Sequence, residues 1–512
     1  MFRLYSSSLY GIEAKIIEVE IDKSGGLFSF SIVGLPDKAI QEAKERVFLA
    51  IKNLGAKTLS RFNQKFVVNL APADLKKEGA FFDLSIAIGA LLSTGQIKNF
   101  NTSDKLFVGE LSLEGKTKKI KGALPIALKA KKEGFKYLIL PKENAFEASL
   151  VKGIKLIPVE SLEEAILWCE GRRKIEFKRN FSFKKEISFE VDLSQVKGQL
   201  KAKRALEIVA AGGHNLLMVG PPGGGKTLLA KSLISILPPL EEEEVIEVSS
   251  IYSSCGFLSE KVPVISFPPF RAPHHSSSHI AILGGGQIPR PGEVTLAHRG
   301  ILFLDEMPEF QRNVLEGIRE PLEEGKITIS RAKQTLVFPA KFVLVGAMNP
   351  CPCGYLGDPE RECKCSLSEI RRYQKKISGP LLDRIDLQIE VPRIEIKNLF
   401  QESNVEELRR IRERVKKARE IQKERNSKNL GKKFILNSFL SSREIEKICN
   451  LGSKEKSILE KAISKYYLSA RSYFKILKIS RTIADLEGSE KVNSDHILEA
   501  LNYRTKLGEI FI

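Results

Sequence analysis

The chain has 512 residues, more than one ordinary hydrophobic core supports, so we expect two or three domains. Its 42% hydrophobic and 28% charged residues are the composition of a soluble globular protein. Lys and Arg outnumber Asp and Glu by 82 to 63, and the net charge of +19 favours an anionic macromolecular partner, nucleic acid first. A merely lysine-rich proteome is the alternative explanation of that surplus.

The sequence shows no sign of export or of membrane insertion. The stretch from Met1 to Ser8 leads into no long apolar run, and no apolar run approaches the length of a membrane span. Seven cysteines, four of them between 351 and 365, do not have the pattern of a secreted disulfide framework. We therefore expect a cytoplasmic protein without a signal peptide or a membrane partner.

Residues 1–170 mix patterns typical of strands and of helices, which predicts an α+β domain. Strands are expected at 14–21, 28–33 and 66–70. A helix should begin at Pro36, whose fixed φ suits a first turn, and end at Gly55. A second, mostly buried helix should span 83–92.

The N-terminal domain resembles the proteolytic domain of Lon proteases, which has a ribosomal-S5-like fold, at 109–116, 120–122 and 139–144. Lys77-Glu78-Gly79 is followed by Ala80-Phe81-Phe82-Asp83, which lacks the catalytic serine of Lon. The helix that should carry the Lon lysine reads Leu124-Pro125-Ile126-Ala127-Leu128. Because both members of the Ser–Lys pair are missing, we expect no peptidase activity and a role in assembly or partner binding.

Three further segments follow the N-terminal domain. Residues 171–190 are basic and weakly patterned, which indicates an interdomain linker; contact with nucleic acid is the alternative. We expect a core domain at 191–395 and a helical lid at 396–512. Within the lid, 405–433 is rich in Arg and Lys and has apolar residues at helical intervals. An exposed amphipathic helix explains this pattern without a contact to DNA.

The stretch Gly220–Thr227 reads Gly-Pro-Pro-Gly-Gly-Gly-Lys-Thr and lies between a predicted strand, 215–219, and a predicted helix, 228–234. That context is the one a phosphate-binding loop needs, and it disfavours a chance match. Lys226 would reach the β- and γ-phosphates of ATP, and the Thr227 hydroxyl would bind Mg²⁺. The residues expected to hold the nucleotide are Gly220, Pro221, Pro222, Gly223, Gly224, Gly225, Lys226, Thr227 and Leu228.

Two carboxylates follow the apolar run 301–304, which predicts a buried strand. Asp305 would act on Mg²⁺ through a water molecule, and Glu306 would polarise the water that attacks ATP. A further strand, 342–348, precedes Asn349, which fits a position that holds the attacking water near the γ-phosphate. Two acids at a strand end could instead cap a helix, but the upstream phosphate loop favours nucleotide chemistry.

The segment 377–386 resembles the arginine-finger segment of AAA+ proteins of the MCM and magnesium-chelatase branch. The resemblance implies that Arg384 enters the site of a neighbouring subunit. There it would stabilise the charge that develops on the γ-phosphoryl group. The alternative is a structural ion pair with Asp383 or Asp386.

The helical pattern of 468–486 resembles the lid of the same proteins. Arg471 matches their second sensor arginine, which would let the lid respond to the γ-phosphate. Arg481 is the weaker candidate for that role.

Nearly all 512 positions resemble the ComM/YifB family of magnesium-chelatase-like AAA+ ATPases. The motifs that carry the resemblance are 220–227, 271–276, 291–298, 304–310, 349–355 and 378–386. The resemblance implies an α/β protein: a Lon-like domain, an AAA+ P-loop core with a parallel sheet, and a helical lid. It also implies ATP and Mg²⁺ as cofactors and a homo-oligomeric ring, expected to be a hexamer. Better-known members act as branch-migration helicases in natural transformation.

Four cysteines form two close pairs, Cys351-x-Cys353 and Cys363-x-Cys365, in a turn-rich segment. Four thiolates on a short loop can enclose one tetrahedral metal ion, and we favour structural zinc. The usual structural spacing is C-x-x-C, so four free thiols are the alternative.

His274, His275 and His279 lie close together in sequence, but we expect no metal there, because the family resemblance assigns that segment to an insert near the pore.

The segment 325–338 reads as two strands around a basic turn. Related helicases carry a pore hairpin at this point of the chain. Arg331 and Lys333 could contact DNA phosphates there and be moved by ATP hydrolysis. The alternative is a hairpin tip that is charged only because it is solvated.

The leading hypothesis is an ATP-driven DNA motor that acts on branched or single-stranded DNA. The second is a motor that remodels a protein complex, as in metal insertion into porphyrins. The third, an ATP-dependent protease, is disfavoured by the missing Ser–Lys pair.

Overall fold

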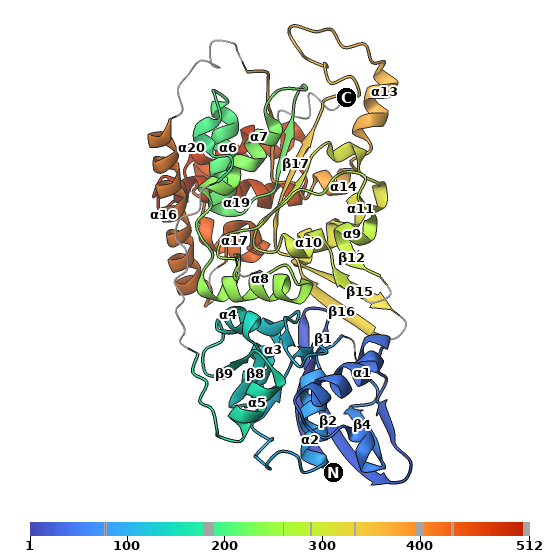
Figure 1. Ribbon diagram of the computed structural model, residues 1–512. Helices are drawn as coiled ribbons and strands as arrows, with labels where there is room; N and C mark the ends of the chain where they lie inside the picture. Colours follow the sequence, from blue (N-terminus) through green and yellow to red (C-terminus); the bar gives the residue numbers. More distant parts are fainter. Residues whose placement is uncertain are drawn as a thin grey trace. The chain divides into compact units, whose positions relative to one another are not determined.

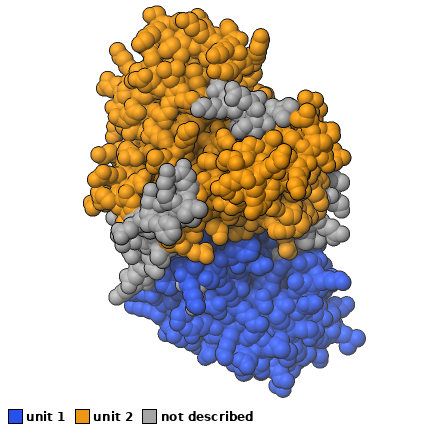
Figure 2. Space-filling model, turned by 90° about the horizontal axis from the view of Figure 1, so that it is seen from above, with its two compact units in different colours: residues 1–183, 242–265 blue, residues 184–241, 266–512 orange. Residues whose placement is uncertain are grey.

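The computed structural model describes residues 1–75, 77, 79–177, 189–259, 261–286, 289–331, 334–394, 404–431 and 435–504. The chain forms two compact units, coloured differently in Figure 2. Unit 1 comprises residues 1–183 and 242–265, and unit 2 comprises 184–241 and 266–512. The boundaries expected at 170, 190 and 395 stay predictions.

Unit 1 contains a seven-stranded mixed sheet with the order β3-β4-β2-β1-β5-β8-β9 (Figure 1). Its strands are β1 (Phe2–Tyr10), β2 (Glu13–Gly25), β3 (Ser29–Val33), β4 (Gln64–Ala71), β5 (Lys105–Phe107), β8 (Tyr137–Pro141) and β9 (Lys155–Val159). β2 pairs antiparallel with β1 and β4, and the other neighbours run parallel. The three strands predicted in this region are confirmed as β2, β3 and β4. A separate two-stranded sheet joins β6 (Glu110–Leu111) and β7 (Thr117–Lys118).

The helices of unit 1 are α1 (Lys38–Asn53), α2 (Asp83–Ser93), α3 (Ala123–Lys132), α4 (Ala145–Ala148), α5 (Leu162–Cys169) and α8 (Glu242–Cys255). All eleven residues of α2 are buried, as predicted. α1 begins at Lys38 and not at Pro36, because the Asp37 carboxylate caps the helix by accepting the Ile40 N–H at 2.8 Å. α8 groups with unit 1 although it follows the phosphate loop in the sequence.

Apolar side chains fill the positions at which the resemblance to Lon proteases would put a serine and a lysine. Phe81 and Phe82 are buried before α2, and Leu124 of α3 is fully buried. Side chains of this kind cannot act as nucleophile or base. The Lon-like topology of unit 1 stays a prediction.

Unit 2 contains a five-stranded sheet with the order β11-β14-β17-β10-β18, in which every neighbouring pair is parallel. The strands are β10 (Leu216–Val219), β11 (Phe270–Arg271), β14 (Ile301–Leu304), β17 (Val343–Met348) and β18 (Leu387–Glu390). The strands predicted at 215–219, 301–304 and 342–348 are therefore confirmed. Because the sheet is parallel, the ends of β10, β14 and β17 that lead into the predicted site meet at one edge.

The C-terminal helices share one hydrophobic core with this sheet. They are α16 (Val405–Leu430), α17 (Ser442–Cys449), α18 (Ser453–Tyr466), α19 (Ala470–Leu486) and α20 (Ser494–Asn502). α16 and α19 pack against each other and against α6 (Leu200–Gly212), which precedes the sheet in sequence (Figure 1). Val415 of α16 and Ile479 of α19 are fully buried there, and each such side chain contributes roughly 1.5–3 kcal/mol.

Short elements complete unit 2. They are α7 (Lys226–Ser232), α9 (His279–Leu283), α10 (Glu293–Leu296), α11 (Arg312–Gly317), α12 (Arg319–Glu324), α13 (Leu367–Gln374), α14 (Gly379–Leu382), β12 (Gly284–Gly285), β13 (Arg290–Pro291), β15 (Lys326–Arg331) and β16 (Gln334–Pro339). Among the helices that the structure describes in either unit, none combines the length and apolarity needed to cross a bilayer.

Candidate functional site

The turn between β10 and α7 has the backbone of a phosphate-binding loop. Gly223 and Gly225 adopt φ values of 79° and 85°, in the left-handed region that favours glycine. A Cβ at Gly220 would lie 2.0 Å from the Val391 carbonyl oxygen, so only glycine fits there. The Gly220 N–H donates to the Met348 carbonyl at 3.2 Å. The loop is therefore held between the ends of β17 and β18.

Lys226 is fixed between this loop and the end of β17. Its Nζ donates to the carbonyl oxygens of Gly220 (2.7 Å) and Pro221 (2.9 Å) and to Asn349 Oδ1 (3.2 Å). Burial lowers the pKa of Lys226, while the nearby charges of Asp305 and Glu306 oppose that shift. A phosphate beside this ammonium would favour its charged form.

Thr227 and Asp305 meet directly. Thr227 Oγ1 donates to Asp305 Oδ2 at 2.7 Å, across the edge at which α7 begins and β14 ends. A hydroxyl and a carboxylate are the oxygen ligands that Mg²⁺ prefers beside a phosphate chain. The donor set therefore fits the predicted magnesium.

Glu306 has a backbone conformation that is uncommon for its residue type. Its φ is 49°, and its N–H donates to Asp305 Oδ1 at 3.0 Å. Its carboxylate lies 3.4 Å from Nδ1 of His275 and is 59% exposed. Glu306 and Asn349 line one cavity of about 410 Å³, together with Arg372, Tyr373 and Lys376 from the region of α13. The structure thus brings Lys226, Thr227, Asp305, Glu306 and Asn349 to one edge of the sheet.

Arg384 lies at the other edge of the same sheet. It precedes β18, which runs parallel to β10 with Leu387 opposite Leu216, and its carbonyl accepts from Asn215 Nδ2 at 3.1 Å. The phosphate loop begins only after Val219, a strand length of about 10–13 Å further along. Arg384 is therefore separated from the phosphate loop of its own chain by the length of β10.

Two arginines converge on Glu323 at this second edge. Arg384 Nη2 lies 2.5 Å from Glu323 Oε1, and Arg471 Nη2 lies 3.6 Å from the same oxygen. The hydrogen bond from Arg384 is the main cause that lowers the pKa of Glu323. Arg384 Nη1 also donates to the Pro380 carbonyl at 2.6 Å. Asp386, an alternative partner expected for Arg384, pairs instead with Lys475 at 2.9 Å.

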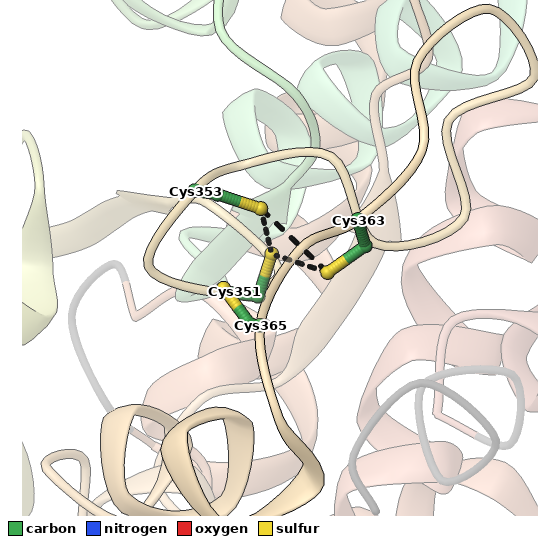
Figure 3. Close-up of side chains that lie close together, drawn as sticks. All are labelled: Cys351, Cys353, Cys363 and Cys365. Atoms are coloured by element: carbon green, nitrogen blue, oxygen red, sulfur yellow. Dashed lines mark hydrogen bonds between the residues drawn. The ribbon is translucent and has the colours of Figure 1, made fainter.

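The four clustered cysteines converge (Figure 3). Cys351 Sγ lies 3.4 Å from Cys353 Sγ and 3.6 Å from Cys363 Sγ, and the Cys353–Cys363 sulfur distance is 3.6 Å. All four sulfurs lie within 4.8 Å of one another. Zn–S bonds of about 2.3 Å in a tetrahedron put sulfurs about 3.8 Å apart, so the cluster fits one zinc ion.

The thiols of the cluster differ in acidity. Burial would raise the pKa of Cys353, but backbone hydrogen bonds from Tyr355 and Lys364 lower it to about 6. Burial raises the pKa of Cys449, away from the cluster, to about 12. The backbone hydrogen bonds thus favour the thiolate of Cys353, the form that binds metal, whereas burial favours the protonated thiol of Cys449.

Three family models match successive parts of the chain. Their descriptions are "Subunit ChlI of Mg-chelatase" for residues 19–144, "Magnesium chelatase, subunit ChlI" for 192–399 and "Magnesium chelatase, subunit ChlI C-terminal" for 406–504. "Competence protein ComM" of Haemophilus influenzae is 43% identical over 98% of this chain and 97% of its own length. The chain belongs to the ComM/YifB family.

Two other relatives differ in how much of the chain they match. "Uncharacterized protein YifB" of Escherichia coli is 40% identical over 98% of this chain and 96% of its own length. The "Magnesium-chelatase 38 kDa subunit" of Rhodobacter capsulatus is 25% identical over 59% of this chain and 83% of its own length. The expected membership of the magnesium-chelatase-like ComM/YifB family is confirmed.

Arg481, the second candidate sensor in this ComM/YifB chain, is a buried structural residue. Its side chain is 1% exposed and donates to Asp485 Oδ1 at 3.0 Å and to the Glu490 carbonyl at 2.8 Å. Its guanidinium thereby binds the backbone that follows the C-terminal end of α19.

The predicted hairpin is present, with β15 and β16 paired antiparallel from Lys326 opposite Pro339 to Arg331 opposite Gln334. Lys333, one of the two predicted DNA contacts, lies outside the described residues. So does the side chain of Arg331, the last residue of β15. Both contacts stay predictions.

Sequence reasoning missed His275 and Glu323 as members of these sites. His275 lies beyond β11 and reaches Glu306, while His274 Nδ1 pairs with Ser276 Oγ at 2.8 Å. Glu323 is one of several acids in α12 and differs from them only by its position in space. Only the order of strands in a parallel sheet, β11 beside β14, could have placed His275 near Glu306.

Proposed function

We propose that this ComM/YifB chain hydrolyses ATP as part of a ring of identical subunits. The observation that carries the proposal is the Lys226–Thr227–Asp305–Glu306 group at one sheet edge with Arg384 at the other. For the ring we adopt the six subunits that the family resemblance implies.

Each residue at the first edge would have a separate role in hydrolysis. The loop N–H groups and Lys226 would bind the β- and γ-phosphates, and Thr227 and Asp305 would hold Mg²⁺, which supplies charge neutralisation when bound. Glu306 would accept a hydrogen bond from the attacking water and turn it toward the γ-phosphorus, with Asn349 orienting the same water. Together these groups position the nucleophile in line with the bond that breaks.

Arg384 would act on a neighbouring subunit. In a ring, each subunit presents one edge of its sheet to the next, so Arg384 can approach the γ-phosphate bound by the adjacent chain. A guanidinium there would stabilise the charge of the transition state. Arg471, which shares Glu323 with Arg384, would accompany it into that site.

We infer further that the motor acts on DNA in the cytoplasm, as a branch-migration helicase or translocase in recombination or natural transformation. The net charge of +19 and the similarity to a competence protein support DNA as the polymer. The similarity to a magnesium-chelatase subunit supports the second candidate, ATP-driven remodelling of a protein complex.

ATPase activity measured with and without forked DNA tests these proposals. We expect hydrolysis that forked DNA stimulates and binding to DNA that strengthens as salt falls. If the protein hydrolyses ATP but neither binds nor unwinds any DNA at low salt, the DNA motor is wrong and the remodelling function remains. If it fails to bind ATP, the whole proposal is wrong.

A further inference from the structure

The cysteine cluster begins where the nucleotide site ends. Cys351 follows Asn349 by two residues, and Asn349 Oδ1 accepts from Lys226 Nζ. The carbonyl of Pro350, between them, accepts from the buried Gln374 Nε2 at 3.0 Å. The chain therefore leaves the nucleotide site through a fixed turn, and the first thiol lies immediately beyond it.

The loop between the cysteine pairs touches the phosphate loop. Gly354 has φ of 86°, and a Cβ at that position would lie 2.6 Å from Pro222 Cδ. Pro222 is one of the two prolines of the phosphate loop. Glycine at 354 thus lets the cysteine loop lie directly against the loop expected to bind ATP.

A second set of contacts ties the cysteine loop to the segment after β18, which itself approaches the phosphate loop. Arg393 Nε lies 2.8 Å from Asp358 Oδ2, and its Nη1 lies 3.1 Å from Glu360 Oε2. Its guanidinium also lies 5.6 Å from the centre of the Tyr355 ring. Arg393 is two residues from Val391, whose carbonyl oxygen closely approaches Gly220 and would lie 3.0 Å from a Cβ at Gly224.

The cysteine loop has almost no apolar core of its own. Between 351 and 365 only Cys351 and Gly354 are buried, and the other residues are half-buried or exposed. A segment of this length needs another source of order, and in small domains a bound metal often supplies it. The four converging sulfurs lie at the centre of the loop (Figure 3).

We propose that the four cysteines bind one thiophilic metal ion, Zn²⁺, and that this ion holds Gly354 and Asp358 in the positions from which they support the phosphate loop. The metal site is then a positioning element for the nucleotide site, acting through Pro222 and Arg393. This inference rests on the proposed ATP binding and assigns the metal no part in the chemistry, since four thiolates leave no open coordination position.

The test measures zinc content and the affinity for a fluorescent ATP analogue in the same preparations of full-length protein. We expect about one zinc per wild-type chain. Replacement of Cys363 and Cys365 by Ser should remove the zinc and weaken nucleotide binding by roughly tenfold or more. Cys169→Ser, outside the cluster, is the matched control and should change neither quantity.

Arg393→Ala tests the contacts of Arg393 with the cysteine loop independently of metal binding. It should retain the zinc and still bind the analogue several-fold more weakly, and circular dichroism checks that each variant is folded. Wild-type protein that binds the analogue but contains well under one zinc overturns the proposal, as does a folded, zinc-free cysteine variant with wild-type affinity. If the cysteine variant does not fold, Arg393→Ala decides: wild-type affinity overturns the coupling. Wild-type protein that binds zinc but no ATP analogue contradicts the proposed function instead.

Discussion

The two edges of the parallel sheet in unit 2 differ in what their charged groups face. At one edge, Lys226 and Thr227 contact Asn349 and Asp305, and all of them come from the ends of strands or the start of a helix. At the other edge, Arg384 and Arg471 share a single carboxylate, Glu323. The first edge holds the residues proposed to bind phosphates, and the second holds two arginines that are separated from them by the length of β10.

That difference is what the proposed function requires: one chain carries two groups of site residues that lie apart within it and would meet only between neighbouring subunits. Two guanidiniums on one carboxylate leave a positive charge that a second anion can approach. Glu323 is 46% exposed and Arg471 60% exposed, and ion pairs of exposed groups contribute only about 0–1 kcal/mol, whereas the Arg384 side chain is only 9% exposed. Under the proposed function, a γ-phosphate from a neighbouring subunit would therefore compete with Glu323 more readily for Arg471 than for Arg384.

The largest expected effect comes from the second edge. Arg384→Ala should lower kcat for ATP hydrolysis by roughly 10³-fold, because a finger arginine acts mainly on the transition state. Affinity for the ATP analogue should change little. Steady-state kinetics and an analogue titration measure both, and Arg409→Ala, an exposed arginine of α16, serves as control. Unchanged kcat in the Arg384 variant would contradict a role of Arg384 in ATP hydrolysis.

Glu306→Gln tests the role of the first edge in ATP hydrolysis. It removes the carboxylate proposed to polarise water but keeps the side-chain volume, so kcat should fall by about 10²-fold while nucleotide binding persists. Glu309→Gln is the control, because Glu309 lines the same cavity and pairs with Lys376 at 3.0 Å. Equal losses in the two variants would show that Glu306 has no special place in the cavity.

Arg471→Ala should have a smaller effect than Arg384→Ala. Its side chain is 60% exposed and its contact to Glu323 is longer, 3.6 Å against 2.5 Å. We expect a loss in kcat of about tenfold, in the range of a single charged hydrogen bond. A loss larger than that of Arg384→Ala, in the same kinetic assay, would reverse the assignment of the finger.

Glu323→Gln should have the smallest effect, and in the opposite direction. Neutralising the shared carboxylate frees both arginines, so kcat of the assembled protein should rise by about twofold or less. The matched control is Glu324→Gln at the next position of α12. A loss of activity as large as that of Arg384→Ala would mean that Glu323 orients the arginine for catalysis.

The sequence predicted the first edge well, because its residues are consecutive or follow apolar strands. Gly220–Thr227, Asp305 and Asn349 each adjoin a strand that the structure confirms. The predicted start of α1 at Pro36 was wrong by two residues, because the helix is capped by Asp37 and begins at Lys38.

Contacts between distant segments could not be predicted in this way. Glu323 and Arg471 are 148 positions apart, and Gly354 and Pro222 are 132 positions apart, with no periodicity that relates them. The same holds for α8, whose place in unit 1 depends on packing and not on its own pattern. Such contacts follow from strand order and packing, which a single sequence does not specify.

Mixing of two inactive variants tests most directly the claim that each site is shared between subunits. Lys226→Ala lacks the loop lysine but keeps Arg384, and Arg384→Ala has the reverse defect. In randomly mixed rings about a quarter of the interfaces pair an intact loop with an intact arginine, so ATPase activity should recover to about a quarter of the wild-type value. Activity no higher than the average of the two separate variants, in rings shown to contain both, would contradict a shared site.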